Sequence, residues 1–409
     1  MGRMNTAASS PKPAAPARGP WEVFAVFLRL GLTSFGGPVA HLGYFHNEFV
    51  VRRRWLKENT YADLVALCQF LPGPASSQVG MAVGLQRAGL PGMLLAWVGF
   101  TLPSALLLFG FALGAPWLSD TLGTGWISGL KAAAVAVVAH AVVSMARMLT
   151  PDARRATLAV ATMAVVLLLP GPLTQVLAML GAALIGLLWL PVPEAAGQQE
   201  AQLEPKVARA ISVTCLVLFV LLLALLPVLR ALTSTAVVAL TDVFYRTGAL
   251  VFGGGHVVLP LLESEMVGNG LVDQEVFLAG YGAAQAVPGP LFTFSSFLGA
   301  SAQLHLASWA GALIALVAIF LPSALLVIGV LPFWEGLRHN AIVRRALGGV
   351  NAAVVGLLAA ALYSPVFTHG VPNTATFVVA ALAFVALSGW KAPAWAVAVG
   401  AAVLGGFLL

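Results

Sequence analysis

The sequence FLRLGLTSFGGP at residues 27–38 recurs in altered form as FYRTGALVFGGG at residues 244–255. The phenylalanine, the arginine, the first glycine and the Phe-Gly-Gly run keep the same spacing in both copies. The adjacent glycines interrupt a stretch that is otherwise apolar, so each copy predicts a helix that is broken partway along its length. A duplication of this kind indicates a fold built from two similar halves.

Further matches extend the duplication along both halves of the chain. They are QFLPGP at 69–74 with QAVPGP at 285–290, LPSAL at 102–106 and again at 321–325, and GLKAA at 129–133 with GVNAA at 349–353. The offset between the copies drifts only by loop-sized steps, so the whole series of apolar segments is duplicated.

The composition places these segments in a membrane. Of the 409 residues, 60% are hydrophobic and only 9% are charged, whereas a soluble domain carries roughly 25% charged residues. This number of charged residues is too small to cover the surface of a soluble protein. Most of the surface must therefore face lipid. We therefore predict an all-α polytopic membrane protein, whose 42 glycines and 25 prolines interrupt its helices.

The composition also excludes several kinds of site. Cys68 and Cys215 both lie in apolar segments, which argues against a disulfide framework, a thiolate metal site or redox chemistry. The chain has a net charge of +6. In a membrane protein such an excess of Lys and Arg indicates basic cytoplasmic loops, and it does not indicate nucleic-acid binding. We expect no cofactor and no metal, and a homodimer is compatible with the sequence.

The apolar segments divide the chain into a predicted series of units. These are a disordered cytoplasmic tail (1–20), a first transporter repeat (21–190), a cytoplasmic linker (191–206), a connecting transmembrane helix (207–230) and a second repeat (231–409). If each repeat crosses the bilayer an even number of times, the single connecting helix inserts the second repeat upside down.

The basic residues agree with this inversion. Arg52, Arg53, Arg54 and Lys57 follow the first broken segment, whereas the equivalent residues 269–275 contain no base. Arg338, Arg344 and Arg345 precede the fourth segment of the second repeat, whereas the first repeat has Asp120 there and no base. We expect the protein to lie in the inner membrane of the cell. The positive-inside rule then places the N-terminus in the cytoplasm and the C-terminus in the periplasm.

Two topologies satisfy the inversion. Keeping Arg52–Arg54, Lys57 and Arg87 inside requires the broken segments to enter and leave on one side, as re-entrant hairpins of half-helices. In the alternative each broken segment crosses the bilayer fully and four bases lie outside. We favour the hairpins, and both versions invert the repeats.

The breaks are the candidate substrate site, because unpaired backbone groups at membrane depth are tolerated only where they line a protected or polar cavity. A half-helix that starts at a Pro-Gly-Pro tip also offers free N–H groups and the positive end of its dipole to an anion. The candidate residues are Arg29, Gly36, Gly37, Pro38, Pro72, Gly73, Pro74, Ser76, Ser77, Arg246, Gly253, Gly254, Pro288, Gly289, Pro290 and Thr293. The competing interpretation is that the breaks are ordinary kinks in long helices.

Arg29 and Arg246 occupy equivalent positions before the two glycine breaks. An arginine at this depth is costly and is usually paired or functional. Its planar, permanently charged fork suits a tetrahedral oxyanion. Snorkelling, or an ion pair with Glu22 or Asp242, is the alternative.

Five further residues are candidates for coupling or gating. Glu48 and Glu265 are equivalent in the two halves and also suit interfacial ion pairs. His41 and His256 follow the breaks, though not at matched positions, and packed histidines would explain them equally well. Asn351 stands at the position of the second repeat that is equivalent to Lys131, and either side chain could contact a substrate oxygen.

The Phe-x-Arg-x-Gly-x-x-x-Phe-Gly-Gly-Pro motif, the Gln-x-x-Pro-Gly-Pro motif and the duplication together resemble the chromate ion transporter family in its long, two-domain form, over residues 20–409. The resemblance implies a secondary transporter of the bacterial inner membrane that exports chromate and confers chromate resistance, with sulfate as a related oxyanion. One departure is Gly255, where the first repeat has Pro38. It leaves open whether both halves bind substrate alike.

The implied direction of transport, export, agrees with the membrane potential. A potential that is negative inside is worth roughly 2.3 kcal/mol per charge per 100 mV, so at 100 mV it drives a dianion outward with about 4.6 kcal/mol. A transporter of another oxyanion such as sulfate and a passive anion channel are the alternatives. The motifs of zinc hydrolases, diphosphate enzymes and serine hydrolases are not found, so we do not expect an enzyme.

Overall fold

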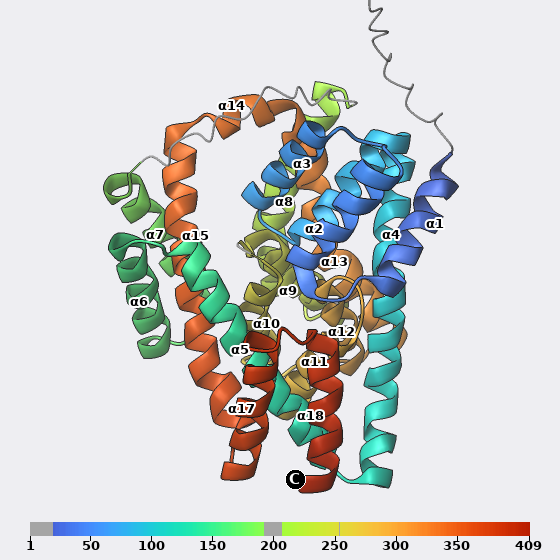
Figure 1. The fold of residues 1–409 in the computed structure, drawn as a ribbon. Coiled ribbons are helices and arrows are strands. Elements are labelled where there is room, and N and C mark those ends of the chain that lie inside the picture. Colours follow the sequence, from blue (N-terminus) through green and yellow to red (C-terminus); the bar gives the residue numbers. More distant parts are fainter. Residues whose placement is uncertain (1–18, 192–206, 253) are drawn as a thin grey trace, which may run out of the picture.

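A computed structural model describes residues 19–191, 207–252 and 254–409 of the chain. Within these ranges every regular element is helical, as the sequence predicts, and no strand occurs (Figure 1). The predicted tail, up to residue 18, nearly all of the predicted linker (192–206) and Gly253 of the candidate site lie outside the described residues.

The helices match the predicted apolar segments. The first repeat contains α1 (Pro20–Thr33), α2 (Gly37–His46), α3 (Glu58–Phe70), α4 (Ala75–Leu122), α5 (Gly125–Leu149), α6 (Ala153–Leu168) and α7 (Pro172–Trp189), with a π-helical turn at Asn47–Arg52. The segment between the repeats forms α8 (Arg209–Leu232). The second repeat contains α9 (Ala236–Leu250), α10 (Val258–Met266), α11 (Gln274–Ala286), α12 (Phe294–Ser301), α13 (Ser308–Val330), α14 (Trp334–Arg338), α15 (Ala341–Ala361), α16 (Thr368–Gly370), α17 (Thr374–Ser388) and α18 (Ala394–Leu408). Short 3-10 turns cover Gly255–Val257, Leu291–Thr293 and Leu331–Phe333, and a second π-helical turn covers Leu362–Phe367.

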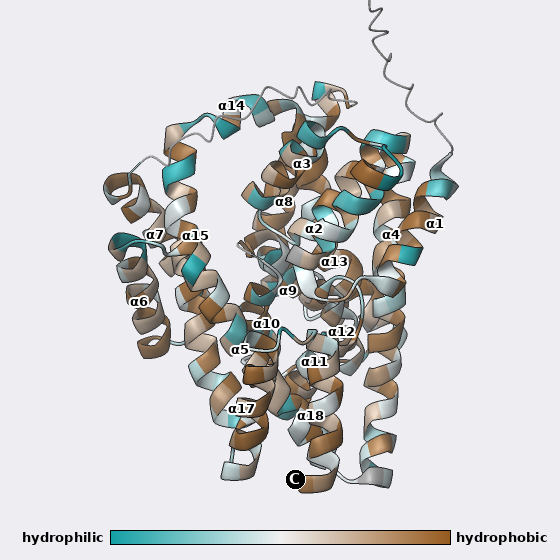
Figure 2. Cartoon of the chain, viewed as in Figure 1, coloured by the Kyte–Doolittle hydropathy of each residue, from teal (hydrophilic) through white to brown (hydrophobic). Residues whose placement is uncertain are grey.

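Five helical stretches in the described part of the chain are long and apolar enough to cross a membrane. They are Ala75–Thr121, Gly125–Leu149, Arg209–Leu232, Ser308–Arg338 and Ala341–Gly370. Large apolar side chains such as Leu188 and Phe407 are more than four-fifths exposed, which in water would be a severe cost. The chain is therefore a multi-pass membrane protein. Figure 2 shows its hydrophilic residues gathered mainly at one end, around α14 and the ends of α2 and α3.

The long helix α4 is a hairpin. Its backbone leaves the helical conformation at Ala88 and Gly89, where Gly89 has a φ of 68°. Gly84 and Gly92 would lie about 12 Å apart along a straight helix, yet their backbones touch, and a methyl group on either would collide with the other's carbonyl oxygen. The same close contact joins Gly299 of α12 to Gly311 of α13. The segment after each Pro-Gly-Pro break therefore turns back on itself.

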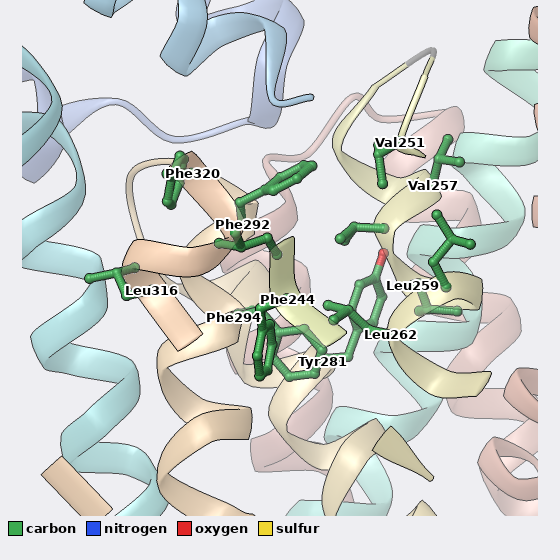
Figure 3. Close-up of a cluster of buried hydrophobic side chains, with 14 of the residues drawn as sticks. Phe244, Val251, Val257, Leu259, Leu262, Tyr281, Phe292, Phe294, Leu316 and Phe320 are labelled. Atoms are coloured by element: carbon green, nitrogen blue, oxygen red, sulfur yellow. The ribbon is translucent and has the colours of Figure 1, made fainter. Parts of the chain in front are cut away.

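An aromatic cluster supports each glycine break. In the first repeat, the Phe27 ring lies 5.7 Å from the Phe45 ring and 5.1 Å from the Phe49 ring, all three fully buried. In the second repeat, Figure 3 shows Phe244, the equivalent of Phe27, packed in a cluster with Tyr281 and Phe294. These dry clusters fix the half-helices on either side of the breaks.

The two repeats exchange their last two helices. α17 and α18 of the second repeat pack against α5 of the first, while α6 and α7 of the first repeat pack against α15 of the second. The helix α8 packs on α9 and α13 and buries little of its own surface, so it lies at the periphery. The helix breaks and the exchanged helices thus tie both repeats into one structure.

Candidate functional site

The breaks of the two repeats meet at one place. The Gly73 N–H of the first Pro-Gly-Pro tip donates a 2.6 Å hydrogen bond to the Val251 carbonyl, which immediately precedes the second glycine break. In the matching contact, the Gly289 N–H donates a 2.9 Å hydrogen bond to the Ser34 carbonyl before the first glycine break. Each tip is therefore fastened to the break of the other repeat. We call this region, formed by residues 34–38, 72–77, 251–252, 254–257 and 288–293, the junction.

Both tips require glycine at their centre. Gly73 has a φ of 118° and Gly289 a φ of 95°, conformations that side-chain-bearing residues rarely adopt. A methyl group on Gly73 would also collide with the Ser323 hydroxyl, and one on Gly289 would stand 2.9 Å from the Ser104 hydroxyl. The two serines belong to the duplicated LPSAL sequence. The flanking prolines Pro72, Pro74, Pro288 and Pro290 border these tips as predicted.

The glycine breaks themselves touch each other. Gly36 and Gly37 have φ values of 102° and 76°, Gly254 has a φ of 133°, and Pro38 lies in the first turn of the half-helix α2. A methyl group on Gly255 would lie 3.4 Å from Cγ of Pro38. Pro38 and Gly255 are equivalent in the duplicated sequence, so the departure from the Gly-Gly-Pro pattern falls where the two copies meet.

Half-helix N-termini bring hydroxyl groups to the junction. α4 begins directly after Pro74 and carries Ser76 and Ser77 in its first turn, both 3% exposed. After Pro290, the Thr293 hydroxyl donates back to the Pro290 carbonyl over 2.7 Å. In the described part of the chain, the buried hydroxyls of Ser34, Ser77 and Ser295 have no hydrogen-bond partner. Free hydroxyls beside free helix N–H groups are donors suited to an oxyanion.

The two histidines have different surroundings. His41 is 1% exposed and bridges the first repeat, because its Nε2 lies 3.2 Å from the Ser34 carbonyl and its Nδ1 3.3 Å from the Ser76 hydroxyl. Nε2 must donate to the carbonyl, so Nδ1 is left to accept from Ser76. His256 instead shares a 2.8 Å hydrogen bond with the Tyr281 hydroxyl. Both histidines border the junction, and His41 is held as a packed, hydrogen-bonded side chain.

The two matched arginines are not in matched surroundings. Arg246 is paired with Asp242 at 2.8 Å and with Glu265 at 3.1 Å. Arg230 of α8 reaches the same two carboxylates at 3.2 and 3.3 Å, and we call these four residues the charge network. Its two bases balance its two acids, which favours the ion-pair interpretation for Arg246. Arg29 is exposed on α1, and no ion pair of its side chain occurs within the described ranges.

The other coupling candidates are also held by opposite charges. Glu48 is 7% exposed and contacts both Arg52 and Arg53. The buried Lys131 of α5 pairs with Glu275 in the first turn of α11, which joins the two repeats. These contacts agree with the structural interpretation of Glu48 and give Lys131 a carboxylate partner.

Several residues of this region were not identified from the sequence. Ser34 has a buried hydroxyl. Its place within the first repeated motif, two residues before Gly36, is the sequence signal that could have identified it. Arg230 could not be found by comparing the repeats, because α8 has no counterpart in either of them. The 3.2 Å ion pair between Arg338 of α14 and Asp63 of α3 joins two helices that are distant in sequence, so no local pattern predicted it.

Within the residues that the structure describes, no group of three His, Cys, Asp or Glu side chains is arranged to hold a metal ion. The site is instead made of broken helices, helix N-termini and hydroxyl groups inside a multi-pass helical bundle. This combination is typical of the class of membrane transporters with discontinuous helices. The chromate transporter family pattern matches residues 21–187 and again residues 238–406, and the chain belongs to this family.

Three relatives illustrate the match. The chromate transport protein of Pseudomonas aeruginosa is 28% identical over 352 residues, covering 83% of this chain and 79% of the relative. The probable chromate transport protein of Synechococcus elongatus is 26% identical over 406 residues, covering 92% and 91%. The chromate transport protein of Cupriavidus metallidurans is 26% identical over 351 residues, covering 83% and 81%. No solved structure matches this chain.

Proposed function

We propose that the chain is a secondary transporter that exports chromate across the inner membrane and so confers chromate resistance. The observation that carries the proposal is the pair of crossed hydrogen bonds at the junction, from Gly73 to Val251 and from Gly289 to Ser34. They bring helix ends from both repeats together, which is how a transporter forms one site between two moving halves.

We further propose that the repeats are inverted and that the broken segments are re-entrant hairpins. Contacts at equivalent positions support a twofold relation: the crossed tips, the contact of Pro38 with Gly255 and the exchange of the last two helices. Residues near a twofold axis contact their own equivalents, as Pro38 and Gly255 do. In Figure 1 the first repeat begins with α1 at the end of the bundle where α14 lies, and the second repeat ends with α18 at the opposite end, which supports an inversion.

The substrate is proposed to bind at the junction, where it would accept hydrogen bonds from the first turn of α4 and from the Ser34 and Ser77 hydroxyls. Arg29 and Arg246 are proposed to neutralise the anion as it passes. Arg29 has the stronger case, since the charge network already balances Arg246. The outward driving force is about 4.6 kcal/mol for a dianion at 100 mV, so export needs no other coupling.

Uptake of radiolabelled chromate into inverted membrane vesicles tests the proposal. We expect saturable uptake that increases when the vesicle lumen is made positive, and competition by sulfate and molybdate that ranks the oxyanions. Arg29→Ala should lower the rate at least tenfold, and Arg246→Ala should lower both the rate and the amount of folded protein. Non-saturable flux without counterflow would indicate a channel instead. Wild-type transport in both variants, inserted normally, would show that the arginines do not neutralise the anion.

A further inference from the structure

A cavity of about 610 Å³ lies between α5 and α17. α5 lines it with His140, Ser144 and Arg147, and α17 lines it with Phe384 and Ser388, followed by Gly389 just after the helix. The ionisable groups in this lining are both basic, and no carboxylate lines it in the described part of the chain. Such a lining favours an anion.

Arg147 has its guanidinium available. It lies exposed in the last turn of α5, and within the described ranges it forms no ion pair. This separates it from Arg246, Arg53 and Arg338, which are each paired with carboxylates. Its fork can therefore hold two oxygens of a tetrahedral anion at once, with the Ser144 and Ser388 hydroxyls as further donors.

The chain that follows the cavity lining contacts the junction. His140 lies deepest of the two basic residues along α5, with its ring 6.5 Å from that of Phe384. Beyond Gly389, the turn between α17 and α18 leads to Trp395, whose ring lies 5.6 Å from that of Phe35 in the first break.

The opposite repeat has no basic residue at the two equivalent positions. By the alignment of Gly129 with Gly349, the positions equivalent to His140 and Arg147 are Ala360 and Phe367. At these two positions a basic lining thus occurs on one side only. The side is that of Arg147 and the neighbouring Arg154 and Arg155, which the positive-inside rule assigns to the cytoplasm.

We propose that this cavity is an anion-binding vestibule, which collects a hydrated tetrahedral dianion from the cytoplasm and delivers it to the junction. The inference rests on the proposed transport of an oxyanion. The cavity could hold on the order of 20 water molecules, so the anion enters with its hydration shell and loses it only at the junction. On the other side, Ala360 and Phe367 carry no charge at the equivalent positions, which favours release.

The test uses a thiol placed in the vestibule. In a background with Cys68→Ala and Cys215→Ala, Ser388→Cys is labelled in inverted vesicles with an anionic and with a cationic methanethiosulfonate of similar size. Each labelling rate is divided by the rate of the same reagent with a free thiol in solution. We expect this ratio to be about tenfold higher for the anionic reagent than for the cationic one, as electrostatic steering predicts. Sulfate should protect the thiol; it replaces chromate here because chromate oxidises thiols. Ser144→Cys serves as a second labelling position if the first variant does not fold.

Arg147→Gln should abolish most of the charge preference and raise the KM for chromate severalfold with a smaller change in kcat, while Arg147→Lys should retain the preference. Arg209→Gln removes the same charge from the exposed start of α8 and should change neither. Equal labelling by both reagents, or a preference that survives Arg147→Gln, would overturn the vestibule. If labelling and sulfate protection behave as expected but chromate does not move, the proposed function fails and the vestibule stands.

Discussion

The two glycine breaks have the same spacing of phenylalanine, arginine and glycine but different electrostatic surroundings. Four residues before Arg246 stands Asp242, whereas four residues before Arg29 stands Ala25. Asp242 is 1% exposed and contacts both Arg246 and Arg230, so the second break is tied to α8 by buried charges. Arg29 is exposed. The duplication therefore preserved the backbone of the break while the charges around it diverged.

The difference teaches that the two halves need not contribute equally to transport. The second repeat has an arginine whose charge is balanced by two carboxylates, and a peripheral helix that contacts the same carboxylates. The first repeat has an arginine without such a clamp and, on the side of α5, the basic vestibule. Substitutions that equalise the two halves test this division.

The largest effect is expected for Asp242→Asn. It leaves Arg230 and Arg246 facing a single carboxylate, and removing one partner of a buried ion pair typically costs about 3–5 kcal/mol. The unfolding temperature in detergent should fall by several degrees. Ala25→Asp is the matched change in the first repeat, where an exposed pair with Arg29 is worth at most about 1 kcal/mol. Equal losses in the two variants would contradict the distinction between the breaks.

The next effect concerns the tips, where the two repeats are alike. Gly73→Ala and Gly289→Ala should each cost about 2–3 kcal/mol, because an alanine at positive φ is strained and meets a serine hydroxyl. Gly73→Ala should be worse, since its methyl group would approach Ser323 more closely than that of Gly289 would approach Ser104. Chromate uptake should fall at least tenfold in both variants.

The control for the tips is Gly110→Ala. Gly110 lies within α4, and a methyl group there would meet no atom within 4 Å. Its uptake should stay near wild type and its stability should rise slightly, because alanine favours a helix over glycine. Normal uptake in either tip variant would mean that the crossed hydrogen bonds are not needed for transport.

These tips also show how far the sequence could predict the structure. The repeated Phe-Gly-Gly and Pro-Gly-Pro runs predicted where the helices break, because glycine and proline act locally on the backbone. The identity of the partners could not be predicted in this way. That Gly73 contacts Val251, and that α5 packs on α17 and α18, depends on the exchange between repeats, which no local pattern records. Arg230 and Arg147 were missed as site residues because the candidate arginines were those shared by both repeats, and neither Arg230 nor Arg147 has an arginine at an equivalent position.

A smaller effect is expected where the repeats meet. Gly255→Pro restores the sequence pattern of the first repeat but places a second ring against Pro38. Overpacking of this kind costs about 1–3 kcal/mol. The exchanged double variant, with Pro38→Gly as well, should recover part of the loss in unfolding temperature and in uptake. Purely additive losses would show that the two residues do not share one space.

The smallest effect distinguishes two helix caps at equivalent places. Asp152 caps α6 by accepting a 3.0 Å hydrogen bond from the Arg155 N–H, and Asn373 caps α17 by accepting one of the same length from the Thr376 N–H. Asp152 lies in the turn before α6, and the Arg155 N–H, followed by its side chain, lowers the pKa of the carboxyl. A carboxyl with a lowered pKa stabilises the fold above its ordinary range near pH 4, and this contribution is lost as the pH falls through the folded pKa.

Asn373 does not titrate, so acid should weaken only the cap of α6. The loss should be about 1 kcal/mol, the typical value of an N-cap. Unfolding of wild type and of Asp152→Asn, measured between about pH 6 and pH 3, should diverge, with the variant less sensitive to acid because its amide keeps the cap without a charge. Asn373→Asp should introduce the same sensitivity at α17. If wild type and Asp152→Asn lose the same stability on acidification, other carboxyls determine the acid sensitivity of the protein. The two caps would then contribute equally to stability at low pH.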